Sequence, residues 1–240
     1  MSSDLTYDFK INTDNNSSAY YWQLRFLDQA NSVLDIGCAT GFFGRYLVEH
    51  GCRVVGIEQS SEAAEKARSV YQRVIVGDVE IPEVKTQIGE TFDAVLLGDV
   101  LEHLKGPGAL LVYIRQAWLK PGGCVVLSVP NSGHWLFRRE VLFGRFPYRQ
   151  LGLFDQTHLR FFTSSSLQAL VETCDYAIDR FAFSVNHNTD DDLTFACLAR
   201  LYQRPAMRVW LVRLERQLAK IFPALFAYQF ILRIKPRTTA

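Results

Sequence analysis

The sequence predicts an α/β domain whose mainly parallel sheet is covered by helices on both faces. Between residues 32 and 129, short runs rich in Val, Ile and Leu alternate with helix-length amphipathic stretches, as in a series of strand–helix–strand units. A glycine-rich turn follows the first of these runs. The chain has 240 residues, 48% of them hydrophobic, which is enough to bury one core, so we predict a single domain over residues 1–240.

The first half of the chain gives a regular series of elements. We expect a helix at residues 17–30, begun by Ser17 or Ser18, and we predict that residues 1–30 form an N-terminal lid. Five strands are predicted at residues 33–36, 53–57, 73–76, 92–97 and 124–129, with helices at 43–49, 62–69 and 108–118 and a turn at Pro121-Gly122-Gly123. Residues 31–129 would form a ligand-binding core.

The regular series stops after residue 129. Residues 130–163 are rich in Arg, His and aromatic side chains and exceed the usual length of a loop without a function, so we predict an acceptor-site insertion there. Residues 164–240 form the C-terminal half. It should contain a helix at 164–172, a strand at 176–185, an exposed turn at Asp190–Asp192, a basic helical region at 195–222 and a final strand at 226–234.

Composition excludes several classes of protein. The five cysteines show no CxxC or Cys/His spacing, which argues against a disulfide framework and a zinc site. There is no apolar leader and no run of about 18 apolar residues, so we expect a cytoplasmic protein. Residues 200–240 hold nine basic side chains and one acid, Glu215. This region is expected to pack over the predicted acceptor site, with peripheral contact to an anionic membrane as the alternative. No nucleic-acid partner is expected, because no recognised module is present.

The glycine turn has two interpretations. Residues 33–41 read VLDIGCATG, a strand running into a turn that lets the backbone approach a nucleotide-like ligand. The spacing Ala39-x-Gly41-x-x-Gly44 also approximates the dinucleotide fingerprint, and Glu58 lies near the position of a ribose-binding acid. The turn alone therefore does not separate S-adenosylmethionine from a nicotinamide cofactor.

Acidic residues at the ends of successive strands favour the first of these cofactors. Asp35, Glu58, Asp78 and Asp99 should converge on one crevice, because ligands of open α/β sheets bind at the carboxyl ends of the strands. Four carboxylates suit a phosphate-free sulfonium cofactor and repel a pyrophosphate. A nicotinamide-dependent oxidoreductase is the first alternative. The sequence contains no Tyr-x-x-x-Lys, the pattern that a short-chain dehydrogenase would require. A non-catalytic cofactor-binding subunit is the second.

These motifs resemble those of class I S-adenosylmethionine-dependent methyltransferases. Asp35-x-Gly37-x-Ala39-x-Gly41 is similar to their first motif, with Ala39 where many members have Gly. The resemblance implies a Rossmann-like seven-stranded sheet with an antiparallel last strand and helical cap insertions. It also implies a set of cofactor-binding residues: Asp35, Gly37, Cys38, Ala39, Gly41, Glu58, Gln59, Asp78, Val79, Gly98, Asp99 and His103.

Residues 130–163 are similar to a bacterial subgroup that includes the ubiquinone-biosynthesis O-methyltransferases. The shared string is Pro130-Asn131…His134…Gly144-Arg145-Phe146-x-Tyr148…Asp155-x-Thr157-His158-x-Arg160-Phe161-Phe162-Thr163. The resemblance implies methyl transfer to a small molecule, such as a sugar, a quinone-like compound or another anionic metabolite, free or lipid-linked. In quinone-methylating relatives a group like Asp99, Glu102 and His103 can hold a divalent ion. We expect no metal here, with these residues serving the cofactor and the pocket mouth instead.

The insertion supplies the candidates for catalysis. His158 is the first candidate for a general base, with Asp155 three residues earlier to orient its ring, and His134 is the second. A purely structural role for His158 is the alternative. Arg145, Tyr148, Arg149 and Arg160 are the candidates for binding an anionic acceptor, and a solvated basic face is the competing interpretation for the arginines.

Overall fold

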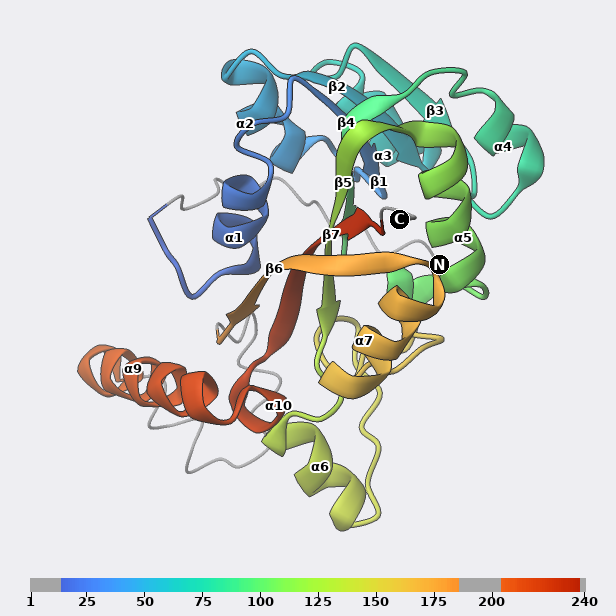
Figure 1. Cartoon of the computed structure of the whole chain (residues 1–240). Helices are drawn as coiled ribbons and strands as arrows, with labels where there is room; N and C mark the ends of the chain where they lie inside the picture. Colours follow the sequence, from blue (N-terminus) through green and yellow to red (C-terminus); the bar gives the residue numbers. More distant parts are fainter. Residues whose placement is uncertain (1–13, 186–203, 238–240) are drawn as a thin grey trace.

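The computed structural model describes residues 14–185 and 204–237 and contains one seven-stranded sheet (Figure 1). The strands are β1 Ser32–Ile36, β2 Arg53–Glu58, β3 Arg73–Val76, β4 Phe92–Gly98, β5 Leu119–Pro130, β6 Tyr176–Ser184 and β7 Gln229–Pro236. Their order across the sheet is β3-β2-β1-β4-β5-β7-β6. Neighbours among β1 to β5 are parallel, whereas β7 runs antiparallel to both β5 and β6. The predicted sheet with a reversed last strand is confirmed.

Helices cover both faces of the sheet. They are α1 Ala19–Phe26, α2 Phe42–Glu49, α3 Ser61–Ala67, α4 Pro82–Thr86, α5 Pro107–Tyr113, α6 Trp135–Leu142, α7 Ser164–Thr173, α9 Pro205–Ile221 and α10 Pro223–Phe226. Successive residues of a strand face opposite sides. Accordingly, Leu34 joins the core shared with α5 and α7, while Val33 joins the core shared with α1, α2 and α3.

Some element boundaries differ from those expected. The helix predicted at residues 108–118 is split into α5 and a π-helical turn at Ile114–Trp118. Strand β5 begins at Leu119 instead of residue 124, because Leu119 pairs with Phe92 across an irregularity in the ladder. Residue 226, predicted to begin the last strand, ends α10 instead. Of the basic helical region, α9 starts at Pro205, and residues 195–203 lie outside the described residues, as does the turn at 190–192.

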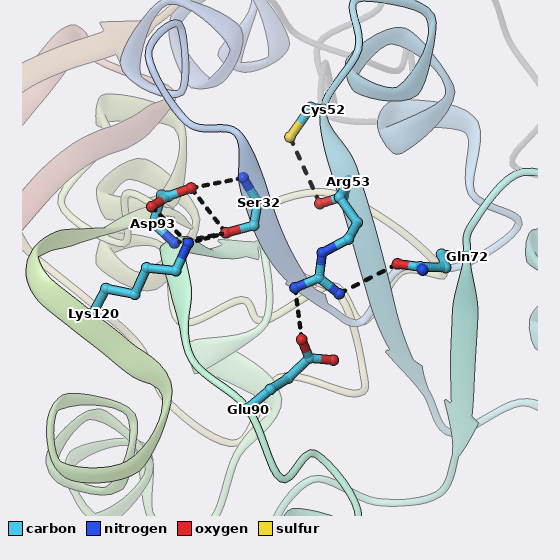
Figure 2. Close-up of polar contacts among 7 residues, drawn as sticks. All are labelled: Ser32, Cys52, Arg53, Gln72, Glu90, Asp93 and Lys120. Atoms are coloured by element: carbon cyan, nitrogen blue, oxygen red, sulfur yellow. Dashed lines mark hydrogen bonds and ion pairs between the residues drawn. The ribbon is translucent and has the colours of Figure 1, made fainter.

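The amino ends of the strands are joined by charged groups (Figure 2). Asp93 at the start of β4 accepts hydrogen bonds from the amide and hydroxyl of Ser32, both at 2.8 Å, and from Lys120 Nζ at 2.9 Å. Arg53 on β2 pairs with Glu90 at 2.6 Å. These contacts fix the starts of β1, β2, β4 and β5 relative to each other. The opposite edge, where the same strands end, is therefore held in register for the turns that follow them.

Candidate cofactor and acceptor site

A cavity of about 740 Å³ opens at the carboxyl edge of the sheet. It lies beside β1 and β4, where the chain order reverses across the sheet and where α/β proteins bind ligands. Eight of the predicted cofactor-binding residues line it: Asp35, Gly37, Cys38, Ala39, Glu58, Gly98, Asp99 and His103. Gly41, Gln59, Asp78 and Val79 do not line this cavity. Of the four strand-end acids, three therefore meet as expected. Asp78 instead accepts a hydrogen bond from the amide of Glu80 at 2.8 Å.

The turn after β1 has the backbone geometry of a ligand cradle. Gly37 has φ +72°, and a Cβ there would lie 2.8 Å from a methyl group of Val100, so only glycine fits. Ala39 also has positive φ, +48°, a conformation that costs an L-residue roughly 1–2 kcal/mol. Its amide donates to Glu58 Oε2 at 2.8 Å, and the Ser60 amide donates to Glu58 Oε1 at 2.8 Å. Glu58 therefore joins the turns that follow β1 and β2.

Asp35 is a buried acid beneath this turn, with 4% of its surface exposed. The Tyr71 hydroxyl donates to Asp35 Oδ2 at 2.5 Å and accepts from the Gly44 amide at 3.1 Å. Burial raises the pKa of Asp35 to about 7, with a contribution from the nearby Glu58 charge, although the Tyr71 hydrogen bond opposes the shift. A cation bound beside Asp35 would favour its ionised form.

Asp99 is fixed at the end of β4 by neighbouring strands. It has φ +54°, and its carboxylate accepts from Ser128 Oγ at 2.6 Å and from Gln229 Nε2 at 2.7 Å. Burial raises the pKa of Asp99, while these two hydrogen bonds oppose the rise. Gln23 of α1 also donates to Ser128 Oγ, at 2.9 Å. Sequence analysis did not find Ser128, Gln229 or Gln23, because no motif marks contacts between residues this far apart in the chain.

Glu102, His103 and His158 form a compact group in the cavity lining. One possible ligand atom from each lies within 4.8 Å of the others. Glu102 is 1% exposed, and its carboxylate oxygens have no hydrogen-bond partner among the described residues. Burial, together with the charge of Asp99, raises the pKa of Glu102 well above its usual value. A carboxylate without a hydrogen-bond partner beside two imidazoles fits a divalent cation. This group could therefore hold a metal ion, and the expectation that none binds stays an untested prediction.

His158 lines the cavity as a neutral imidazole. Burial, reinforced by His103, lowers its pKa from 6.5 to about 4, although the Asp155 charge opposes this. No hydrogen bond joins Asp155 to the His158 ring in the described structure, so the orienting role of Asp155 stays a prediction. Asp155 Oδ1 instead accepts from the Thr157 amide at 2.7 Å and hydroxyl at 2.6 Å. The Thr157 hydroxyl lies 3.1 Å from His103 Nδ1, so Asp155 contacts His103 through Thr157.

The second candidate base, His134, lies away from the cavity lining. It is 1% exposed, and its Nδ1 accepts from the Leu136 amide at 3.3 Å at the start of α6. The ring therefore caps a helix, and the geometry does not support its catalytic role.

The predicted acceptor-binding residues also lie outside the lining. Arg145 Nε donates to Glu140 at 2.8 Å, and Arg160 donates to the Lys105 carbonyl. Neither these two nor Tyr148 or Arg149 lines the cavity. From residue 130 onward, the residues that do line it are Pro130, Leu151, Gly152, Asp155, His158, Tyr228 and Gln229. The described lining contains five acidic side chains, Asp35, Glu58, Asp99, Glu102 and Asp155, and no Lys or Arg. Without Lys or Arg, the described lining offers no permanent positive charge to stabilise an anionic reacting group.

The family model described as a methyltransferase domain matches residues 19–180. The chain belongs to this methyltransferase family. It is 28% identical over 154 residues to a ubiquinone biosynthesis O-methyltransferase of Dechloromonas aromatica, a match covering 60% of this chain and 66% of that protein. The relative with the same name from Shewanella sp. is 26% identical over 166 residues, covering 64% and 69%. The chain thus matches about two thirds of the length of these relatives.

Solved structures share the fold. A methyltransferase from Archaeoglobus fulgidus described as SAM dependent has a TM-score of 0.57 at 18% identity, covering 91% of this chain and 95% of its own. The plantazolicin methyltransferase BpumL, solved in complex with SAH, has a TM-score of 0.56 at 18% identity, covering 92% and 83%. The predicted methyltransferase family and its Rossmann-like fold are confirmed.

Proposed function

We propose that the protein transfers the methyl group of S-adenosylmethionine to a hydroxyl oxygen of a small acceptor whose reacting part is uncharged. The observation that supports this is a single cavity joining the glycine turn and strand-end acids to His158. Its carboxylate lining, without Lys or Arg, suits a cationic donor and repels a pyrophosphate, which counts against the nicotinamide alternative. The O-methyltransferase name of the relatives supports oxygen as the methylated atom.

The residues of the cavity suit an in-line displacement. The bound cofactor would supply a methyl group on a sulfonium, and the neutral thioether of S-adenosylhomocysteine would be the leaving group as the C–S bond breaks. Asp35 and the turn from Gly37 to Ala39 hold the donor side, while Leu151 and Tyr228 wall the acceptor side and exclude water. The neutral ring of His158 accepts the hydroxyl proton as the new bond forms.

A metal-assisted form of the same reaction is the second candidate. Glu102, His103 and His158 would hold the divalent ion, which would polarise the acceptor oxygen and favour its deprotonation. In that case His158 is a ligand, and the proton leaves to water or to another group.

The acceptor class and the membrane contact complete the proposal. A hydroxylated quinone-like ring or a sugar fits a lining without Lys or Arg, and any anionic or lipid portion would stay outside, near the arginines of the insertion. No helix in the described part of the chain is long and apolar enough to span a bilayer. Contact of α9 with a membrane is peripheral in this proposal, through exposed residues such as Trp210 and Leu214.

Calorimetry followed by turnover assays tests the function. S-adenosylhomocysteine should bind in the micromolar range or tighter, about −8 kcal/mol, and NAD should give no heat. Methyl transfer is then measured against a panel of hydroxylated phenols, quinols and sugars. Binding of NAD instead of S-adenosylhomocysteine would overturn the assignment. Cofactor binding without turnover on any acceptor would favour the non-catalytic subunit.

A further inference from the structure

One end of the molecule presents apolar side chains to solvent on two helices that are distant in the sequence. At the end of α6, Leu142 is 81% exposed and is followed by the exposed Phe143. On α9, Trp210 is 56% exposed, and Ile221 and the adjacent Phe222 are exposed as well. Large apolar residues rarely gather at a surface unless they meet a partner, so this end, which we call the α6–α9 end, requires an explanation.

The two helices belong to one structural unit. Leu136 of α6 belongs to a small core with Phe154 and Tyr228, and Leu211 and Val212 of α9 pack against the same core. Figure 1 shows α6, α10 and α9 together at the lower end of the molecule, away from α2 to α4. The inner faces of α6 and α9 therefore pack against this core, and their exposed apolar residues are available for contact with a partner.

The charges of this end are sorted by sign. The acids of residues 134–163 and 204–228 are Glu140, Asp155 and Glu215, and all three are buried. The basic side chains of the same segments that the structure describes as exposed are Arg138, Arg145, Arg160, Arg204, Arg213 and Lys220. Within these two segments, the described surface therefore combines apolar and cationic groups and shows no exposed carboxylate.

We infer that the α6–α9 end docks on the surface of an anionic lipid bilayer. Leu142, Phe143 and Trp210 enter the boundary between headgroups and acyl chains, and the basic residues contact lipid phosphates. Nucleic acid matches the charge but offers no environment for aliphatic side chains such as Leu142 and Ile221, so a bilayer fits better. The inference rests on the proposed contact of α9 with an anionic membrane and extends it by adding α6.

Docking would also orient the cavity. Tyr228 belongs to the small core beneath the α6–α9 end and lines the cavity at the same time. Leu151 and Gly152, which line the acceptor side, come from the same insertion as α6. The part of the cavity formed by these residues is therefore next to the docking surface.

Vesicle sedimentation tests the inference with the full chain. The probe is vesicles of equal parts phosphatidylglycerol and phosphatidylcholine, compared with pure phosphatidylcholine. We expect binding to the anionic vesicles only, weakening as salt is raised. Leu142→Ser and Trp210→Ser should each lower the partition coefficient about tenfold, since each removes one inserted side chain. The matched control is Ile81→Ser, which removes an exposed apolar side chain just before α4 and should change nothing.

Three results would overturn the inference. Binding that is lost in Trp210→Ser but kept in Leu142→Ser would leave α9 as the contact and remove α6. Equal binding to neutral vesicles would remove the role of the arginines. Binding to an oligonucleotide and not to vesicles would show that this surface binds nucleic acid and not a bilayer. Melting temperature and S-adenosylhomocysteine affinity, measured on every variant, show that the fold is intact. Neither sedimentation nor affinity needs an acceptor, so failure here is distinct from failure of the proposed methyl transfer.

Discussion

His158 combines a position on the cavity wall with a ring that stays neutral at physiological pH. Its pKa is lowered to about 4 by burial, with a contribution from His103, so the ring is unprotonated and able to take a proton without first losing one. Replacing His158 with Ala should therefore lower kcat by about 10²–10⁴, with little change in cofactor affinity. Steady-state kinetics and calorimetry with S-adenosylhomocysteine measure the two effects separately.

The control for this variant is His50→Gln, because His50 is exposed at the end of α2 and lies outside the cavity lining. Both variants are assayed with and without EDTA. A loss of wild-type activity in EDTA that Mg²⁺ or Zn²⁺ restores would contradict the base assignment and make His158 a ligand with Glu102 and His103.

Asp35 should make cofactor binding depend on pH. In the free protein its pKa is about 7, raised mainly by burial, so below that pH the group holds a proton. The positive charge of the cofactor favours the ionised carboxylate, and binding at low pH must therefore release the proton. Affinity should weaken as pH falls below about 7, by up to tenfold per unit. Calorimetry between about pH 6 and 8 tests this, and Asp35→Asn should bind weakly at every pH. A pH-independent affinity in the wild type would contradict the prediction.

At the level of elements, the turn between β1 and α2 contains one residue that fits its conformation poorly. Ala39 has φ +48°, where glycine is free of the steric penalty of an L-residue. Ala39→Gly should raise the free energy of unfolding by about 0.5 kcal/mol, since relief of strain exceeds the added entropy of the unfolded chain. Gly37→Ala should do the opposite, by about 1–3 kcal/mol, because its Cβ would meet Val100. Urea denaturation of both variants checks the pair, and a less stable Ala39→Gly variant would contradict the argument.

The contacts at the starts of the strands (Figure 2) should affect stability without affecting the site. Although burial opposes ionisation of Asp93, hydrogen bonds from Lys120 and Ser32 outweigh it and lower the pKa. Asp93→Asn should cost about 1 kcal/mol of unfolding free energy, since the group is partly exposed. Because the folded pKa is lowered, this contribution is present above about pH 3.8 and disappears as pH falls further. Weakened S-adenosylhomocysteine binding in this variant would show that the two edges of the sheet are coupled.

The sequence predicted helices and strands well where residues close together in the chain determine them. Strand β3 falls at residues 73–76 as expected, because a β-branched run there ends at Gly77. Helix α6 was missed because His134 caps it and none of the usual N-cap residues is present. In the site, the glycine turn and Asp35 were found from their spacing. The Ser128 and Gln229 contacts to Asp99 join different strands, and nothing in the spacing shows which way Arg145 or Arg160 points from its loop.

For the whole molecule, the net charge of +1 hides a separation of charge. The described cavity lining carries acidic side chains and no Lys or Arg, whereas the exposed charges described within residues 134–163 and 204–228 are basic. Fields of this kind act over distances comparable to a small domain at low salt. The acidic cavity attracts the cationic donor, and the basic α6–α9 end attracts an anionic surface. One chain can thereby bind a cation and approach an anionic interface without the two functions competing.

This separation predicts different salt dependences for the cofactor and its product. S-adenosylmethionine carries one more positive charge than S-adenosylhomocysteine, so the carboxylates of the cavity should favour it more strongly at low ionic strength. Raising salt from about 0.05 to 0.5 M should weaken the binding of S-adenosylmethionine several-fold more than the binding of S-adenosylhomocysteine, since screening acts on the additional charge. Calorimetry with both ligands at several salt concentrations measures the difference. Equal salt dependence would mean that the sulfonium does not sense the carboxylates, and the electrostatic argument for this cofactor would lose its physical basis.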